Sequence, residues 1–154
     1  PGIDPEYYQK YVNSDVPVKI IFGQTYRLLQ QAKAALVTSG TATLETALFR
    51  VPQVVCYYIP MGKVISFLRR HILKVKYISL VNLVADKEVV RELVADTMTV
   101  ANVRAELDAL LNDVAYRENM LREYDRMIEI LGPAGASRQA ASKMIELLSV
   151  RKGK

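Results

Sequence analysis

The first 60 residues alternate short, nearly continuous apolar runs with segments of helical periodicity. The apolar runs cover residues 18–22, 35–38 and 53–59, and runs of this kind are typical of strands buried on both faces. Between them, residues 25–33 and 41–50 carry apolar side chains at the spacing of one helix face. This order predicts a strand–helix–strand–helix–strand series, in which right-handed crossovers join strands of a parallel sheet.

Beyond residue 60 the pattern is mainly helical. It predicts a helix from Met61 to Lys74 and a short strand at residues 77–80. The remaining helices are expected at residues 88–94, 99–112, 114–131 and 136–150. The predicted fold is therefore a Rossmann-like, three-layer α/β/α structure with a parallel sheet and a helical C-terminal segment. We expect one partial domain over residues 1–154, because Pro1-Gly2 is an unusual beginning for a natural chain.

The turn Ser39-Gly40-Thr41 follows the second predicted strand and precedes a predicted helix. Gly40 would let the backbone approach a ligand closely, and the unpaired N–H groups of the first helical turn would face that ligand. Together with the Ser39 and Thr41 hydroxyls, they suit a phosphate or diphosphate. The alternative is a simple helix cap by Ser39 or Thr41, and the turn alone does not decide between the two.

Glu45 favours a nucleotide over a bare phosphate at this turn. A capping box would place a Ser or Thr three residues before the acid, and that position is Ala42. Glu45 lies four residues after Thr41, on the same helix face. Because bound phosphates repel a carboxylate, Glu45 would instead accept hydrogen bonds from neutral ribose hydroxyls. A solvated Glu on an exposed face is the alternative.

Composition adds a charge asymmetry and argues against two kinds of enzyme. The chain has a net charge of +5, and residues 1–85 carry 10 Lys and Arg against four Asp and Glu. That half is expected to meet a phosphate-bearing partner or an anionic membrane. Cys56 is the only cysteine and His71 the only histidine, which argues against a thiol enzyme or a zinc site.

The predicted helix from Met61 to Lys74 combines apolar residues with Lys and Arg and contains no acid. Basic amphipathic helices of this kind favour an anionic membrane interface. The alternative is a surface helix that packs its apolar stripe on the sheet. A nucleic-acid partner is not expected, because the aromatic residues form no stacking pattern.

Two separated motifs resemble the lipid-A-disaccharide synthase family of bacterial glycosyltransferases. The first is ALVTSGTATLETALFRVPQVVCY at residues 35–57, and the second is VKYISLVNLV at residues 75–84. Residues 136–148 are similar to the closing helix of the family, so the resemblance extends over nearly the whole chain. Val81 departs from the pattern, since relatives often have proline before the asparagine.

The resemblance implies the C-terminal, nucleotide-sugar-binding half of a GT-B fold, without its N-terminal domain. The family transfers 2,3-diacylglucosamine from UDP to 2,3-diacylglucosamine-1-phosphate (lipid X), with inversion and without a bound metal or cofactor. It implies a cytoplasmic enzyme on the inner membrane of a Gram-negative bacterium. The general base is expected in the N-terminal domain, so no catalytic residue is assigned and the chain alone is expected to be inactive.

By motif match, Ser39, Gly40 and Thr41 would hold the diphosphate and Glu45 the ribose. Asn82 would lie near the donor, and Gln24 is a further candidate from the turn after the first predicted strand. The competing interpretation is a flavodoxin-like module that binds a nucleotide or phosphate without catalysis.

Overall fold

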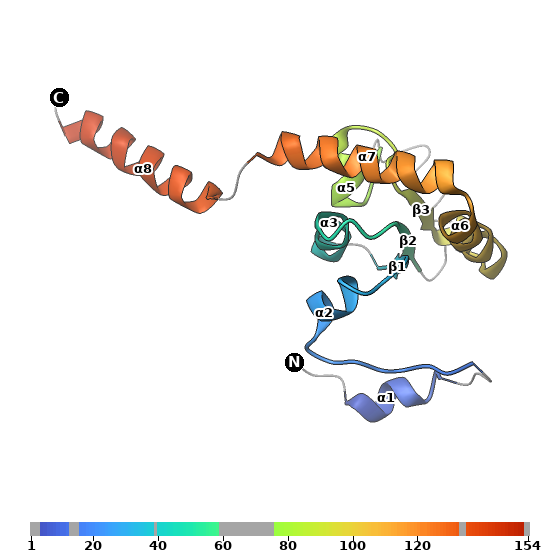
Figure 1. Ribbon diagram of the computed structural model, residues 1–154. Coiled ribbons are helices and arrows are strands. Elements are labelled where there is room, and N and C mark those ends of the chain that lie inside the picture. The colour runs from blue at the N-terminus through green and yellow to red at the C-terminus, as the bar shows by residue number, and fades with distance from the viewer. Residues whose placement is uncertain (1–3, 13–15, 39, 59–75, 133–134, 153–154) are drawn as a thin grey trace. The chain divides into compact units, whose positions relative to one another are not determined.

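The computed structural model describes residues 4–12, 16–38, 40–58, 76–132 and 135–152 (Figure 1). The chain divides into two compact units, Pro1–Ala32 and Lys33–Lys154. The first unit contains two short helices, α1 (Pro5–Gln9) and α2 (Thr25–Leu29). The carboxylate of Asp4 caps α1 by accepting a hydrogen bond from the N–H of Glu6.

The strand predicted at residues 18–22 is absent from the structure, so this prediction was wrong. The segment pairs with none of the three strands of the described sheet, and Val18, Ile21 and Phe22 are exposed. A β-branched run becomes a strand only where its N–H and C=O groups meet a neighbouring strand. Phe22 instead packs edge-on against Tyr8, with ring centroids 5.6 Å apart.

The second unit is built on a parallel sheet of three strands in the order β1-β2-β3. The strands are β1 (Ala35–Val37), β2 (Gln53–Tyr57) and β3 (Arg91–Val94). Val37 pairs with Val55 of the central strand, and Val55 pairs with Glu92 on its other side. The first two strands confirm the apolar runs predicted there.

Residues 77–94 differ from the prediction. The expected strand at 77–80 is a loop in which Ser79 caps α5 (Leu80–Ala85), and the helix expected at 88–94 contains β3 instead. Val90 and Leu93 are buried beside β2. Here pairing with a buried neighbouring strand overrides a local pattern that resembled a helix.

The other helices follow the predicted pattern closely. They are α3 (Thr41–Leu48), α6 (Val100–Asn112), α7 (Val114–Leu131) and α8 (Ala136–Lys152), and a 3-10 turn, η1 (Ala95–Thr97), precedes α6. Thr99 caps α6, and Asp113 caps α7. Gly132 ends α7 with a positive φ of 73°, a conformation in which glycine is not strained.

The core of the second unit lies between the sheet and the helices around it. α3 and α5 each connect neighbouring parallel strands, and α7 packs against both (Figure 1). α6 packs against β2 and β3. Buried residues from every layer meet in one cluster, namely Ala47, Val54, Val55, Val81, Val90, Leu110, Met120, Tyr124 and Met127. The predicted Rossmann-like α/β fold with a parallel sheet is confirmed.

Candidate functional site

The start of α3 lies just beyond the carboxyl end of β1. β1 ends at Val37, and Gly40 is the N-cap of α3 with φ 114° and ψ −160°. This backbone conformation is essentially restricted to glycine. In parallel α/β sheets, ligands bind at this edge, where strand ends meet helix N-termini.

No side chain in the described part of the chain caps α3. Gly40 has no side chain to offer, and the hydroxyl of Thr43 donates to the Gly40 carbonyl oxygen, 2.8 Å away. That hydroxyl acts as a donor to the N-cap carbonyl and does not cap the N–H groups of the first turn. The N–H groups of Thr41 and Ala42 therefore remain for another acceptor. These donors, together with the positive end of the helix dipole, favour an anion.

Glu45 lies on α3, one turn after Thr41. Its side chain is half-buried, and among the residues that the structure describes it has no hydrogen bond or ion pair. Thr41 itself is exposed. The structure therefore brings Gly40, Thr41 and Glu45 together on a single helix start, while Ser39 lies outside the described residues.

Asn82 is fully buried on α5, and protein groups fill all four of its hydrogen-bonding positions. Its amide oxygen accepts from the N–H groups of Val89 and Val90, at 2.8 and 2.9 Å. Its amide nitrogen donates to the Val90 carbonyl at 2.8 Å and to the Glu92 carboxylate at 2.9 Å. Asn82 thus fastens α5 to the beginning of β3, and a direct hydrogen bond to a ligand would require one of these bonds to break.

Gln24 belongs to the first unit, where it is the N-cap residue of α2. Its side chain is exposed, and its amide oxygen accepts from the Arg27 guanidinium at 3.5 Å. The predicted contribution of Gln24 to the same site stays a prediction.

Sequence reasoning missed Glu92, which joins β3 to the start of α5. Its carboxylate accepts hydrogen bonds from the backbone N–H groups of Ile78 and Ser79, at distances of 2.9 to 3.1 Å. It also accepts from the Ser79 hydroxyl at 2.8 Å. The sequence did not reveal this role of Glu92, because residues 88–94 were predicted as a helix, in which Glu92 would have been a solvated side chain.

Three sequence-based interpretations concern residues outside this helix start. Cys56 is half-buried, and burial raises the pKa of its thiol, which fits a small hydrophobic residue better than a reactive one. In the parts of the chain that the structure covers, no three His, Cys, Asp or Glu side chains gather to hold a metal ion. The basic segment from Met61 to Lys74 lies outside the described residues.

The fold is that of a Rossmann-like α/β protein, in which α3 begins beyond the first strand at a glycine N-cap without a side-chain cap. Comparison with known proteins then identifies the family. The family model described as lipid-A-disaccharide synthetase matches residues 3–145, so the chain belongs to that family.

Curated relatives support the same family. A lipid-A-disaccharide synthase of Psychromonas ingrahamii is 38% identical over 147 residues, which cover 96% of this chain and 37% of that protein. Another, from Myxococcus xanthus, is 35% identical over 149 residues, covering 96% of this chain and 38% of the relative. A third, from Prochlorococcus marinus, is 38% identical over 122 residues and 78% of this chain. The chain thus spans little more than a third of the length of the first two relatives.

Proposed function

We propose that this chain is the donor-binding part of a lipid-A-disaccharide synthase and holds the UDP end of UDP-2,3-diacylglucosamine. The observation that carries this proposal is the start of α3, where a glycine N-cap leaves N–H donors without a side-chain cap. The family match supplies the substrate class, because relatives that cover nearly all of this chain are named lipid-A-disaccharide synthases.

In this proposal the two ends of the site have different tasks. Gly40 and Thr41, with Ser39, bind the diphosphate through backbone N–H and hydroxyl groups, and Glu45 accepts hydrogen bonds from the ribose. During transfer of the sugar to lipid X, negative charge develops on the departing UDP. N–H groups already aimed at the diphosphate, together with the helix dipole, would stabilise that charge. The base for the acceptor hydroxyl would come from the part of the enzyme outside this chain.

Asn82 and Gln24 enter the proposal in different ways. Since the described fold uses every polar atom of the Asn82 side chain, Asn82 would act near the donor by fixing α5 and β3. Gln24 stays a candidate on the motif match alone; its amide oxygen accepts from the Arg27 guanidinium at 3.5 Å.

Glu45 gives the sharpest test of the proposed site. We expect Glu45→Ala to weaken UDP binding by about 10- to 100-fold, the worth of a hydrogen bond to a charged group. The same variant should bind inorganic pyrophosphate as well as the unaltered chain or better, because a nearby like charge is removed and no ribose is present. Both affinities can be measured by isothermal titration calorimetry.

The matched control is Glu129→Ala, which removes an exposed carboxylate from α7. It should leave both affinities unchanged. Equal losses of UDP and pyrophosphate affinity in Glu45→Ala would contradict the ribose role. Failure of the unaltered chain to bind millimolar UDP would contradict the proposed function itself.

We also propose that the enzyme works at the cytoplasmic surface of an anionic membrane, where both acylated substrates reside. Among the described residues, no helix is long and apolar enough to cross a membrane. The support for a surface attachment comes from the sequence between Met61 and Lys74, which combines Lys and Arg with apolar residues and contains no acid.

Charge reversal tests this attachment. Replacing Arg69, Arg70 and Lys74 by Glu should abolish most co-sedimentation with phosphatidylglycerol vesicles at low salt, because attraction to anionic lipid becomes repulsion. Binding to neutral phosphatidylcholine vesicles serves as the control and should stay weak in both proteins. Undiminished binding of the variant to anionic vesicles would contradict the proposal.

A further inference from the structure

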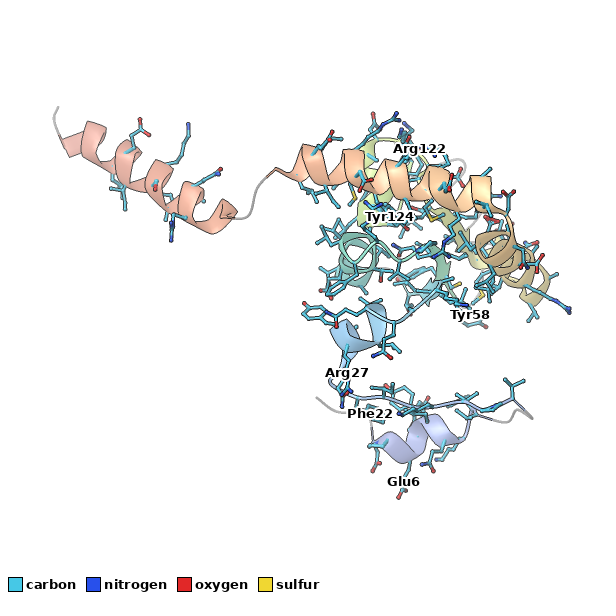
Figure 2. All side chains as sticks on the ribbon, in the orientation of Figure 1. Glu6, Phe22, Arg27, Tyr58, Arg122 and Tyr124 are labelled. Carbon is cyan, nitrogen blue, oxygen red and sulfur yellow. The ribbon has the colours of Figure 1, made fainter. Side chains whose placement is uncertain are left out.

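A row of buried polar side chains lies behind the start of α3. Its members are Thr43 of α3, Gln53 at the beginning of β2 and Tyr124 of α7, and all three are fully buried. Figure 2 shows Tyr124 between α7 and the elements below it. Two helices and a strand thus meet behind the start of α3, and α7 is far from the other two in the sequence.

Hydrogen bonds connect this row from the turn to α7. The hydroxyl of Thr43 donates to the Gly40 carbonyl at 2.8 Å, and the Gln53 amide donates to the Thr43 carbonyl at 2.9 Å. The Gln53 amide nitrogen also lies 3.3 Å from the Tyr124 hydroxyl, which reaches the carbonyl of Val51 at 3.4 Å. Burial raises the pKa of the Tyr124 phenol, so Tyr124 stays neutral and keeps its proton for this contact.

The hydrogen bond from the Thr43 hydroxyl to the Gly40 carbonyl helps to fix the direction of the Thr41 N–H group. The carbonyl of Gly40 and the N–H of Thr41 belong to the same peptide group, which is planar and trans. Their directions are therefore opposite and fixed relative to each other. The Gly40 carbonyl accepts from the Thr43 hydroxyl at 2.8 Å and from the backbone N–H of Thr43 at 3.2 Å. Because these bonds hold the carbonyl toward α3, the Thr41 N–H points away from the body of the helix, toward the position of the proposed diphosphate.

Stability alone does not explain this row. Burying polar side chains costs free energy unless every polar atom is paired, and apolar residues of similar size would fill the same space. The Gln53 amide oxygen is buried without a hydrogen-bond partner in the described structure. These buried polar side chains therefore lower the stability of the fold, and they lie where the backbone of the turn has to be oriented.

We propose that Thr43, supported by Gln53 and Tyr124, is the positioning residue that aims the Thr41 N–H at the diphosphate. This inference rests on the proposed function, since it assigns an orienting role behind the same site. Thr43 touches no ligand in this account and acts through the Gly40–Thr41 peptide. Without the hydroxyl, the Gly40 carbonyl keeps the longer bond from the Thr43 N–H, and the peptide next to the unrestricted Gly40 backbone is fixed less firmly.

The test compares Thr43→Val with Thr43→Ser in the 154-residue chain. Valine keeps the shape of threonine and removes the hydroxyl, whereas serine keeps the hydroxyl and removes a methyl group. We expect Thr43→Val to weaken both UDP and inorganic pyrophosphate binding by about tenfold, a loss that matches one well-aligned hydrogen bond. Thr43→Ser should bind both ligands within about twofold of the unaltered chain, although it lacks buried apolar contacts.

A purely structural role of Thr43 would give a different pattern. In that case both variants would lower the melting temperature while UDP affinity, measured well below melting, stayed unchanged, and the inference would be overturned. Tyr124→Phe provides an independent arm, because it removes only the far end of the row and should weaken UDP binding less than Thr43→Val. A larger loss in Tyr124→Phe would also overturn the assignment.

The control that separates this inference from the proposed function is the unaltered chain. If it binds UDP and pyrophosphate and Thr43→Val binds them equally well, only the positioning role fails. If the unaltered chain binds neither ligand, the diphosphate site fails and the positioning role fails with it.

Discussion

Replacing Asn82 by alanine is expected to lower the free energy of unfolding by about 3–5 kcal/mol, one of the largest effects available in this chain. The substitution removes all four hydrogen bonds of a fully buried amide and leaves the N–H groups of Val89 and Val90 without their acceptor. Buried donors without partners carry a desolvation cost in addition to the lost bonds. Urea unfolding followed by circular dichroism measures the change.

Asn112→Ala is the matched control for this prediction. Asn112 is exposed on α6, and its amide donates to Asp108 one turn away. We expect its loss to change the free energy of unfolding by no more than about 0.5 kcal/mol, since alanine is a better helix former. If Asn82→Ala costs no more than Asn112→Ala, the network between α5 and β3 does not hold the fold as described.

Replacing Gly40 by alanine is expected to weaken UDP binding by about 100-fold, the equivalent of two charge-assisted hydrogen bonds. Gly40 has φ 114° and ψ −160°, where an L side chain is strained although no atom lies within 4 Å of the added Cβ. The backbone would relieve this strain by rotating, and the N–H groups of the turn would move away from the ligand. Calorimetric titration with UDP measures the loss.

Gly132→Ala separates strain from binding. Gly132 has φ 73° and ψ −176° at the end of α7, and space around it is equally open. Both variants should lose a similar free energy of unfolding, about 1–3 kcal/mol. Only Gly40→Ala should lose UDP affinity. Equal UDP affinity in the two variants would show that the turn at Gly40 does not hold the diphosphate.

The segment from β1 to β2 could be predicted from the sequence because its signals are local. The apolar runs of β1 and β2, the glycine before α3 and the helical spacing after Thr41 all lie within about two dozen residues. The same holds for α6 and α7, whose N-caps Thr99 and Asp113 directly precede their helices.

Other elements could not be predicted because their conformation depends on distant partners. β3 resembles a helix locally and is a strand because β2 offers it a buried edge. Residues 18–22 resemble a strand locally and are not one, since no strand of the described sheet pairs with them. In both cases a non-local ladder of hydrogen bonds, or its absence, decides the outcome.

Some residues of the candidate site could likewise be predicted from local sequence, whereas others depend on distant contacts. Gly40, Thr41 and Glu45 were predicted from their spacing along one helix, and the structure keeps them on one helix start. The surroundings of Asn82 and the row behind Gly40 depend on contacts between residues up to 73 positions apart, as in the pair of Val51 and Tyr124. Sequence periodicity carries no information about such contacts.

The most direct test of the proposed diphosphate site is a titration of the isotope-labelled 154-residue chain with UDP, followed by amide NMR spectroscopy. The account predicts that the N–H resonances of Thr41 and Ala42 shift most, in the direction expected for hydrogen bonds to an anion, and that pyrophosphate produces the same shifts. Shifts confined to residues outside the start of α3, or none with UDP in the millimolar range, would contradict it.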